Sequence, residues 1–182
     1  MKKVLLPLAT GFEELEAVTV IDILRRANIS VTVAGLNDGV ITGSRGTRIL
    51  PDEILDTNSA SDYDMIVLPG GLPGADNLNN DSRIHRLLKQ MADDGRYIAA
   101  ICAAPKVLAA AGLLDNKEVT SFPGALSDTN TVGMRYTGKA IVTDGNVITS
   151  RGPGTAMDFS LELVRLLVGA ETQQQVEQGL QR

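Results

Sequence analysis

Short apolar runs that alternate with helical patterns constrain the fold of this chain more than any other feature of its sequence. Runs typical of buried strands occupy residues 4–8, 31–36, 65–68, 97–101, 140–143 and 147–150. Patterns typical of helices occupy residues 13–28, 82–94, 103–112 and 155–168, and Asp144-Gly145-Asn146 indicates a hairpin turn between the last two strands. This alternation predicts an open, mainly parallel sheet covered by helices on both faces, in one domain over residues 1–182.

Two details refine this fold prediction. In the first expected helix, apolar residues recur at threefold spacing and predict one buried stripe, made of Leu15, Val18, Ile21 and Leu24. The stretch VITGSRGTRILPDEIL interrupts the alternation and predicts an extra antiparallel ribbon that carries Arg45 and Arg48.

Charge and composition exclude several classes of partner. The net charge of −5 and the aromatic content of 3% argue against binding to nucleic acid. The apolar start is too short for a signal peptide and runs into Glu13 and Glu14, and no run approaches the ~18 apolar residues of a membrane span. A single cysteine cannot form an internal disulfide, so we expect a protein of the reducing cytoplasm.

Cys102, the only cysteine, lies between the strand pattern of residues 97–101 and a helical run. A lone cysteine is more often a small hydrophobic side chain in a core than a reactive group. At a helix start, however, the helix dipole favours the thiolate, and Pro105 suits the first turn of a helix that begins at Cys102 or Ala103. The position therefore favours a nucleophile with a lowered thiol pKa at a strand-to-helix elbow.

Gly70 and Gly71 follow another expected strand, in the stretch PGGLPG. A Gly-Gly pair alone is typical of an ordinary turn. The carboxyl ends of parallel strands meet at one sheet edge, however, so the amides of these glycines can point at an anion bound there. We therefore expect an oxyanion hole at this turn.

Three acidic residues, Glu13, Glu14 and Glu16, open the first expected helix. Acids in a first turn usually complement the helix dipole on a solvated face, and we expect this of Glu13 and Glu14. Glu16 lies on a different face and can turn toward the sheet edge. Burial there would raise the pKa of its carboxyl group toward the range useful for proton transfer.

His85, the only histidine, falls on the wet side of its expected helix, whose core face is formed by Ile84, Leu87, Leu88 and Met91. A Cys–His pair is therefore not expected. One cysteine and one histidine make no zinc site, and the sequence has neither of the glycine-rich motifs that hold nucleotide phosphates. We expect chemistry without a metal or a cofactor.

Four turns together resemble the ThiJ/PfpI superfamily, and within it the branch of DJ-1 (Parkinson disease protein 7) and its bacterial YajL-like relatives. The matching stretches are GFEELEA, VLPGGLPGADNL, AAICAAP and TSRGPGTAMDF, in this order over nearly the whole chain. The resemblance implies a flavodoxin-like three-layer α/β sandwich that is usually a homodimer. It also implies that Arg45 and Arg151 lie near the site and the dimer interface, where anions often bind.

The same resemblance assigns roles at the sheet edge. It implies that Cys102 is an oxidation-prone nucleophile and that Glu16 is a protonated acid hydrogen-bonded to the sulfur. It further implies that three backbone amides face the site, those of Gly70, Gly71 and Ala103.

One position departs from the family pattern, because Phe122 stands where DJ-1 proteins have a histidine near the cysteine. The protease-like branch has a histidine directly after the cysteine, where this chain has Ala103, so peptidase activity is not expected. The resemblance implies defence against carbonyl stress, as a cofactor-free glyoxalase acting on 2-oxoaldehydes such as methylglyoxal or as a deglycase of protein and nucleotide adducts. The alternative is a non-enzymatic redox sensor or chaperone that works through oxidation of Cys102.

Overall fold

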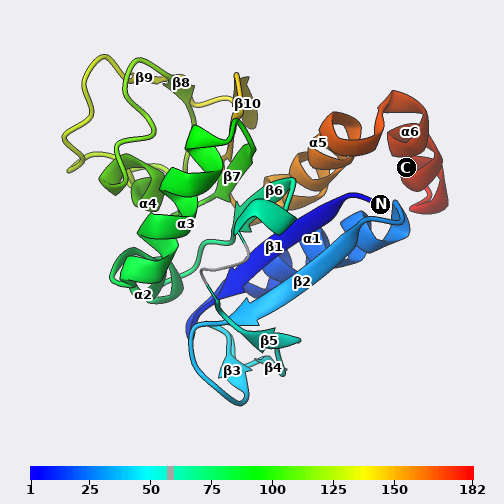
Figure 1. Cartoon of the computed structure of the whole chain (residues 1–182). Coiled ribbons are helices and arrows are strands. Elements are labelled where there is room, and N and C mark those ends of the chain that lie inside the picture. Colours follow the sequence, from blue (N-terminus) through cyan, green and yellow to red (C-terminus); the bar gives the residue numbers. More distant parts are fainter. Residues whose placement is uncertain (57–59) are drawn as a thin grey trace.

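A seven-stranded sheet forms the centre of the molecule, in the order β10-β11-β7-β6-β1-β2-β5 (Figure 1). The computed structural model describes residues 1–56 and 60–182. The strands are β1 (Lys3–Leu8), β2 (Ser30–Gly35), β5 (Glu53–Ile54), β6 (Met65–Leu68), β7 (Tyr97–Ile101), β10 (Ile141–Asp144) and β11 (Val147–Ser150). Every neighbouring pair is parallel except the β10–β11 hairpin, which confirms the mainly parallel sheet predicted from the sequence. The run β2-β1-β6-β7-β11 has the strand order of flavodoxin-like sheets.

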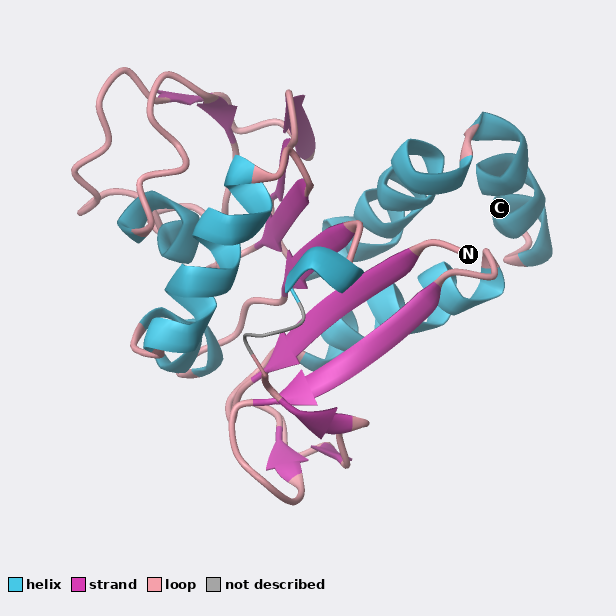
Figure 2. Ribbon diagram, viewed as in Figure 1, coloured by secondary structure: helices cyan, strands magenta, loops and turns pink. Residues whose placement is uncertain are grey.

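Helices cover both faces of this sheet, as Figure 2 shows. One face carries α1 (Glu14–Arg26), α5 (Ala156–Val168) and α6 (Ala170–Gly179), and the other carries α2 (Gly74–Asn79), α3 (Ser82–Asp93) and α4 (Pro105–Ala110). Strand β1 shows the alternation that produces two cores, because Leu6 packs toward α1 whereas Leu5 packs toward α3. The expected three-layer α/β sandwich is confirmed. Among the described residues, no helix combines the length and the apolar character needed to cross a membrane.

The buried face of α1 differs from the predicted one. Leu15 is 62% exposed and Val18 is 45% exposed, although both were expected in one buried stripe with Leu24. The helix turns a neighbouring face inward instead, formed by Glu16, Ala17, Val20, Ile23 and Leu24. Residues at threefold spacing lie along one side of a helix, but the spacing alone does not show that this side is the buried one. In α1 the small Ala17 lets the adjacent side of the helix pack against the core.

The segment after β2 forms the predicted ribbon, in which β3 (Ile41–Thr42) pairs antiparallel with β4 (Arg48–Ile49). The carboxylate of Glu14 holds its turn, because Oε1 accepts the amides of Arg45 at 2.6 Å and Thr47 at 3.3 Å. Burial opposes ionisation, but these hydrogen bonds lower the pKa of Glu14. The expectation of a merely solvated Glu14 was therefore wrong.

A further pair of short strands, β8 (Glu118–Val119) and β9 (Arg135–Tyr136), lies beside β10.

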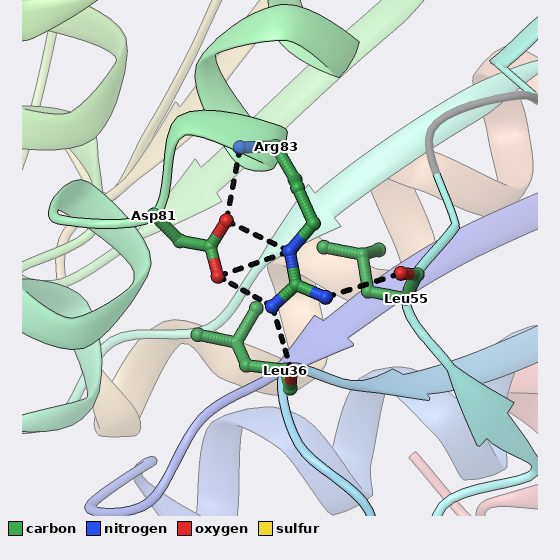
Figure 3. A network of polar contacts seen from close by, with 4 residues as sticks. All are labelled: Leu36, Leu55, Asp81 and Arg83. Carbon is green, nitrogen blue, oxygen red and sulfur yellow. Dashed lines mark hydrogen bonds and ion pairs between the residues drawn. The ribbon is translucent and has the colours of Figure 1, made fainter.

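Arg83 ties α3 to the chain that leaves strands β2 and β5 (Figure 3). Its guanidinium group forms an ion pair with Asp81, the N-cap of α3, and donates to the carbonyl oxygens of Leu36 at 2.6 Å and Leu55 at 3.3 Å. The hydrogen bond from Arg83 holds the pKa of Asp81 below its usual value. These contacts fix the carboxyl end of the sheet, where ligands bind in folds of this type.

Candidate active site

Cys102 occupies a strained turn between β7 and α4. Its φ of 64° lies in the left-handed region, which costs a residue with a side chain about 1–3 kcal/mol and often marks a functional position. Two backbone hydrogen bonds hold it, because its amide donates to the Ser150 carbonyl at 2.9 Å and its carbonyl accepts from the Phe122 amide at 2.8 Å. The predicted elbow is thus present. Helix α4 itself begins only at Pro105, and so later than predicted.

Glu16 is fully buried at the start of α1 and reaches the same sheet edge. Its Oε2 accepts the amide of Gly70 at 2.7 Å, whereas its Oε1 is buried without a hydrogen-bond partner of regular geometry among the described residues. Burial raises the pKa of Glu16 to about 7, against the hydrogen bonds with Cys102 and Gly70 that lower it. The carboxyl group therefore can both accept and release a proton near neutral pH, as expected from the sequence.

Gly70 packs closely against both Cys102 and Glu16. A Cβ atom at this position would lie 2.7 Å from the Cβ of Cys102 and 2.8 Å from Oε2 of Glu16, so only glycine fits without rearrangement. Its amide is already used by the Glu16 carboxyl group. The prediction that Gly70 supplies an oxyanion-hole amide was therefore wrong, because this amide positions the carboxyl group instead.

The amides of Gly71 and Ala103 do point at the sulfur of Cys102 and act to lower its pKa. They are outweighed, because burial, then the charge of Glu16 and its hydrogen bond raise the pKa of the Cys102 thiol to about 12. The prediction of a lowered thiol pKa is contradicted by this arrangement. The sequence indicates a helix start, and so a helix dipole, next to Cys102. It does not show that the thiol is desolvated or that a carboxylate lies beside it.

The two arginines of the predicted anion site are placed differently. Arg151 directly follows Ser150, whose carbonyl accepts the Cys102 amide, so it lies at the same sheet edge. Arg45 lies in the exposed turn between β3 and β4, and its guanidinium group donates to the Ser44 carbonyl at 3.5 Å. Within the described part of the chain, no hydrogen bond or ion pair connects Arg45 with Cys102. Anion binding by this pair stays a prediction.

The single histidine lies away from Cys102 in the fold. His85 lies on α3, where its Nε2 is 2.8 Å from the carbonyl oxygen of Asn79. Across residues 1–56 and 60–182, no group of three or more His, Cys, Asp or Glu side chains is arranged to hold a metal ion. The titratable side chain that acts on the pKa of Cys102 through a hydrogen bond and its charge is that of Glu16.

The site also borders a cavity of about 770 Å³ that the sequence did not reveal as a feature. Its walls include Ala103, Leu72 and Phe122, which belong to three separate turns. Phe122 was noted as a departure from a family pattern. Its exposed ring and its place in this wall depend on tertiary packing, for which the sequence carries no periodic signal.

Similarity to known proteins agrees with this geometry. The family model described as the DJ-1/PfpI family matches residues 2–166. The chain belongs to this family. Protein dj-1beta of Drosophila melanogaster is 44% identical over 180 residues, which cover 98% of this chain and 96% of that protein. The Parkinson disease protein 7 homolog of Danio rerio is also 44% identical, over 98% of this chain and 96% of that protein.

A relative of named activity and two solved structures extend the comparison. The glutathione-independent glyoxalase DJR-1.2 of Caenorhabditis elegans is 36% identical over 87% of this chain and 84% of that protein. The crystal structure of Drosophila melanogaster DJ-1beta has a TM-score of 0.92 and 46% identity over 98% of this chain and 97% of that chain. Oxidized Toxoplasma gondii DJ-1 has a TM-score of 0.91 and 34% identity over 99% of this chain and 98% of that chain. The flavodoxin-like fold and the DJ-1 relationship are thereby shown; the YajL-like placement stays a prediction.

Proposed function

We propose that this protein is a cysteine-dependent, cofactor-free glyoxalase that converts methylglyoxal-like 2-oxoaldehydes to 2-hydroxy acids, and that it relieves carbonyl stress in the cytoplasm. The observation that carries the proposal is the buried Glu16 carboxyl group, which is hydrogen-bonded to the Cys102 thiol and has a pKa of about 7. The C. elegans relative, named a glutathione-independent glyoxalase, supports the same reaction class. Deglycation of an adduct would add one step, in which the bond between the former aldehyde carbon and the amine nitrogen breaks and the amine leaves with a proton.

The reaction begins with attack of the Cys102 sulfur on the aldehyde carbon. Since the thiol pKa is raised to about 12, the Glu16 carboxylate takes the thiol proton as the carbon–sulfur bond forms. The carbonyl oxygen gains negative charge, which the amides of Gly71 and Ala103 stabilise, and Glu16 returns the proton to it. The product of this step is a hemithioacetal, and Glu16 is again a carboxylate.

An internal redox step follows, in which the former aldehyde carbon is oxidised and the ketone carbon is reduced. Glu16 removes the proton from the first carbon to give an enediolate and delivers it to the second carbon. The hydroxyl proton of the first carbon passes to the oxygen of the second carbon, which leaves a 2-hydroxyacyl thioester on Cys102. Water then cleaves the carbon–sulfur bond, releases the 2-hydroxy acid and returns the proton to the thiol. The sum is one 2-oxoaldehyde plus one water to one 2-hydroxy acid, without an external oxidant.

Lactate formation from methylglyoxal, without glutathione, tests the proposal. Wild type should form lactate, Cys102→Ala should form none above buffer, and Glu16→Gln should lose about 10²–10⁴-fold in kcat/KM. Wild-type rates in Cys102→Ala, or no lactate from wild type, would overturn it. Far-UV circular dichroism of both variants checks that they are folded.

A second candidate function is redox sensing through Cys102. Supporting it, the same amides of Gly71 and Ala103 that point at the sulfur could bind the oxygens of a sulfinic acid. A sensor would react once with peroxide, whereas the enzyme needs a reduced, cycling thiol. Mass spectrometry after peroxide treatment, set beside lactate turnover, separates the two.

We also propose a homodimer, in which the exposed apolar line of α1 is covered by a second copy. Leu15 and Val18 lie one helical turn apart on one face, and large apolar side chains adjacent on a surface favour association. This proposal accounts for the apolar line that the single chain leaves uncovered.

A further inference from the structure

The cavity of about 770 Å³ lies beside the candidate active site and meets it at Ala103. Ala103, part of its wall, follows Cys102 in the chain and points its amide at the sulfur. A molecule joined to this sulfur can therefore extend into the cavity.

The size of the cavity exceeds what methylglyoxal requires. Cavities of about 300–1,000 Å³ typically hold drug-sized ligands, whereas methylglyoxal carries only a methyl group beyond its two carbonyl groups. The remaining space fits a bulky substituent on the second carbonyl carbon.

Phe122 supplies the aromatic part of the wall. Its backbone is fixed beside the site, because its amide donates to the Cys102 carbonyl at 2.8 Å, and its ring lies next to Gly152. Half of the residue is nevertheless exposed, at 50%. The residue is thus fixed through its backbone next to Cys102, and its ring keeps an accessible surface.

The charges around the cavity do not favour an anionic ligand. Lys106 lines it, but its ammonium group forms an ion pair with the carboxylate of Asp76. Leu72, 59% exposed, and Pro123 add apolar surface near the ring of Phe122. An uncharged apolar substituent therefore suits this wall better than a charged one.

We infer that Phe122 and this cavity bind an aromatic substituent of a compound that reacts at Cys102, so that Phe122 sets the substrate preference of the site. The inference rests on the proposed function for its substrate class, which is then the aryl 2-oxoaldehydes. Offset or edge-to-face contact between two rings adds to the effect of buried area alone, so an aryl group gains more here than an aliphatic group of equal bulk.

Alkylation of Cys102 tests the cavity without requiring turnover. The rates with iodoacetanilide and iodoacetamide are measured at the same pH and divided by the corresponding rates with free glutathione. The normalised aryl preference should be about threefold to tenfold larger in wild type than in Phe122→Ala. Phe122→Tyr should retain the preference, and Phe122→Leu, the matched aliphatic control, should lose most of it. An equal preference in wild type and Phe122→Ala overturns the inference.

Turnover then tests the substrate class. The ratio of kcat/KM for phenylglyoxal to that for methylglyoxal should fall about threefold to tenfold in Phe122→Ala, while cyclohexylglyoxal should be little affected. A fall that is equal for the phenyl and cyclohexyl compounds overturns the aromatic preference. If no aldehyde is turned over while the alkylation preference is present, the proposed function fails and the aromatic site stands.

Discussion

The carboxyl group of Glu16 is hydrogen-bonded to the thiol of Cys102, and both side chains pack against Gly70, where a Cβ atom would collide with them. Each group changes the protonation of the other, because the carboxylate charge disfavours the thiolate. Glu16 has a pKa of about 7 and Cys102 of about 12, so over the intervening range the pair carries one negative charge and one proton. In this range a carboxylate therefore stands next to a protonated thiol, the pairing that the proposed general base and nucleophile require.

The first prediction concerns the pH dependence of alkylation. In wild type the rate of iodoacetamide reaction should still rise above the free-thiol pKa of ~8.5. Glu16→Gln removes the charge and the hydrogen bond that disfavour the thiolate, so its midpoint should move lower by about one unit or more. Stopped reactions analysed by mass spectrometry give both curves. A higher midpoint in Glu16→Gln would mean that the carboxyl group donates its proton to a thiolate.

Turnover should follow the protonation of Glu16. Because the carboxylate must accept the thiol proton, kcat/KM for methylglyoxal should rise with pH around a midpoint of about 7. Lactate formation measured across this range gives the profile. The residual activity of Glu16→Gln should lack this midpoint, and an unchanged profile in that variant would remove Glu16 from the proton transfer.

The raised pKa of Glu16 also predicts how stability changes with pH. The folded state binds the proton of Glu16 more tightly than the unfolded state does. The stability that this proton binding contributes is therefore complete below the ordinary pKa of 4.5 and is lost as pH rises through about 7. From about pH 5 to about pH 8, wild type should lose about 3 kcal/mol in its free energy of unfolding relative to Glu16→Gln. Urea unfolding of both proteins gives the difference. A constant difference would contradict the raised pKa.

A methyl group at Gly70 should damage the site and the fold together. The Cβ of Gly70→Ala would meet Cys102 Cβ at 2.7 Å, Glu16 Oε2 at 2.8 Å and the Ile101 carbonyl oxygen at 2.9 Å. We expect a loss of about 1–3 kcal/mol in the free energy of unfolding, as for other overpacked cores, and a loss of lactate formation. Gly154→Ala is the matched control, because nothing lies within 4 Å of its added Cβ. Equal behaviour of the two variants would show that the spacing at Gly70 is not critical.

Much of the sheet could be predicted from the sequence because its central strands are buried on both faces. The expected ranges 65–68, 97–101 and 147–150 match β6, β7 and β11 to the residue. Such strands are continuous apolar runs with glycine, proline or polar residues at their ends. Helix α6, AETQQQVEQG, could not be predicted in this way, because Val176 is its single buried residue and leaves no periodic pattern.

The site was only partly predictable for a related reason. Cys102 and Glu16 were found because an elbow, an acidic first turn and a family resemblance all point to one sheet edge. Two features of the site could not be predicted: the acceptor of the Gly70 amide and the extent to which burial opposes the thiolate. They depend on distances of a few tenths of an ångström and on solvent exclusion. Neither is encoded in local sequence.

The last prediction concerns the exposed apolar line of α1. If a second copy covers Leu15 and Val18, a charge at Leu15 would be desolvated in the interface without a partner, so Leu15→Arg should be monomeric. Multi-angle light scattering at micromolar concentration should show twice the chain mass of 19.3 kDa for wild type and a single chain mass for the variant. Val132→Arg places the same charge at a position that is 67% exposed and distant in sequence, and it should remain dimeric. A monomeric wild type would end the dimer proposal, and a dimeric Leu15→Arg would move the interface away from α1.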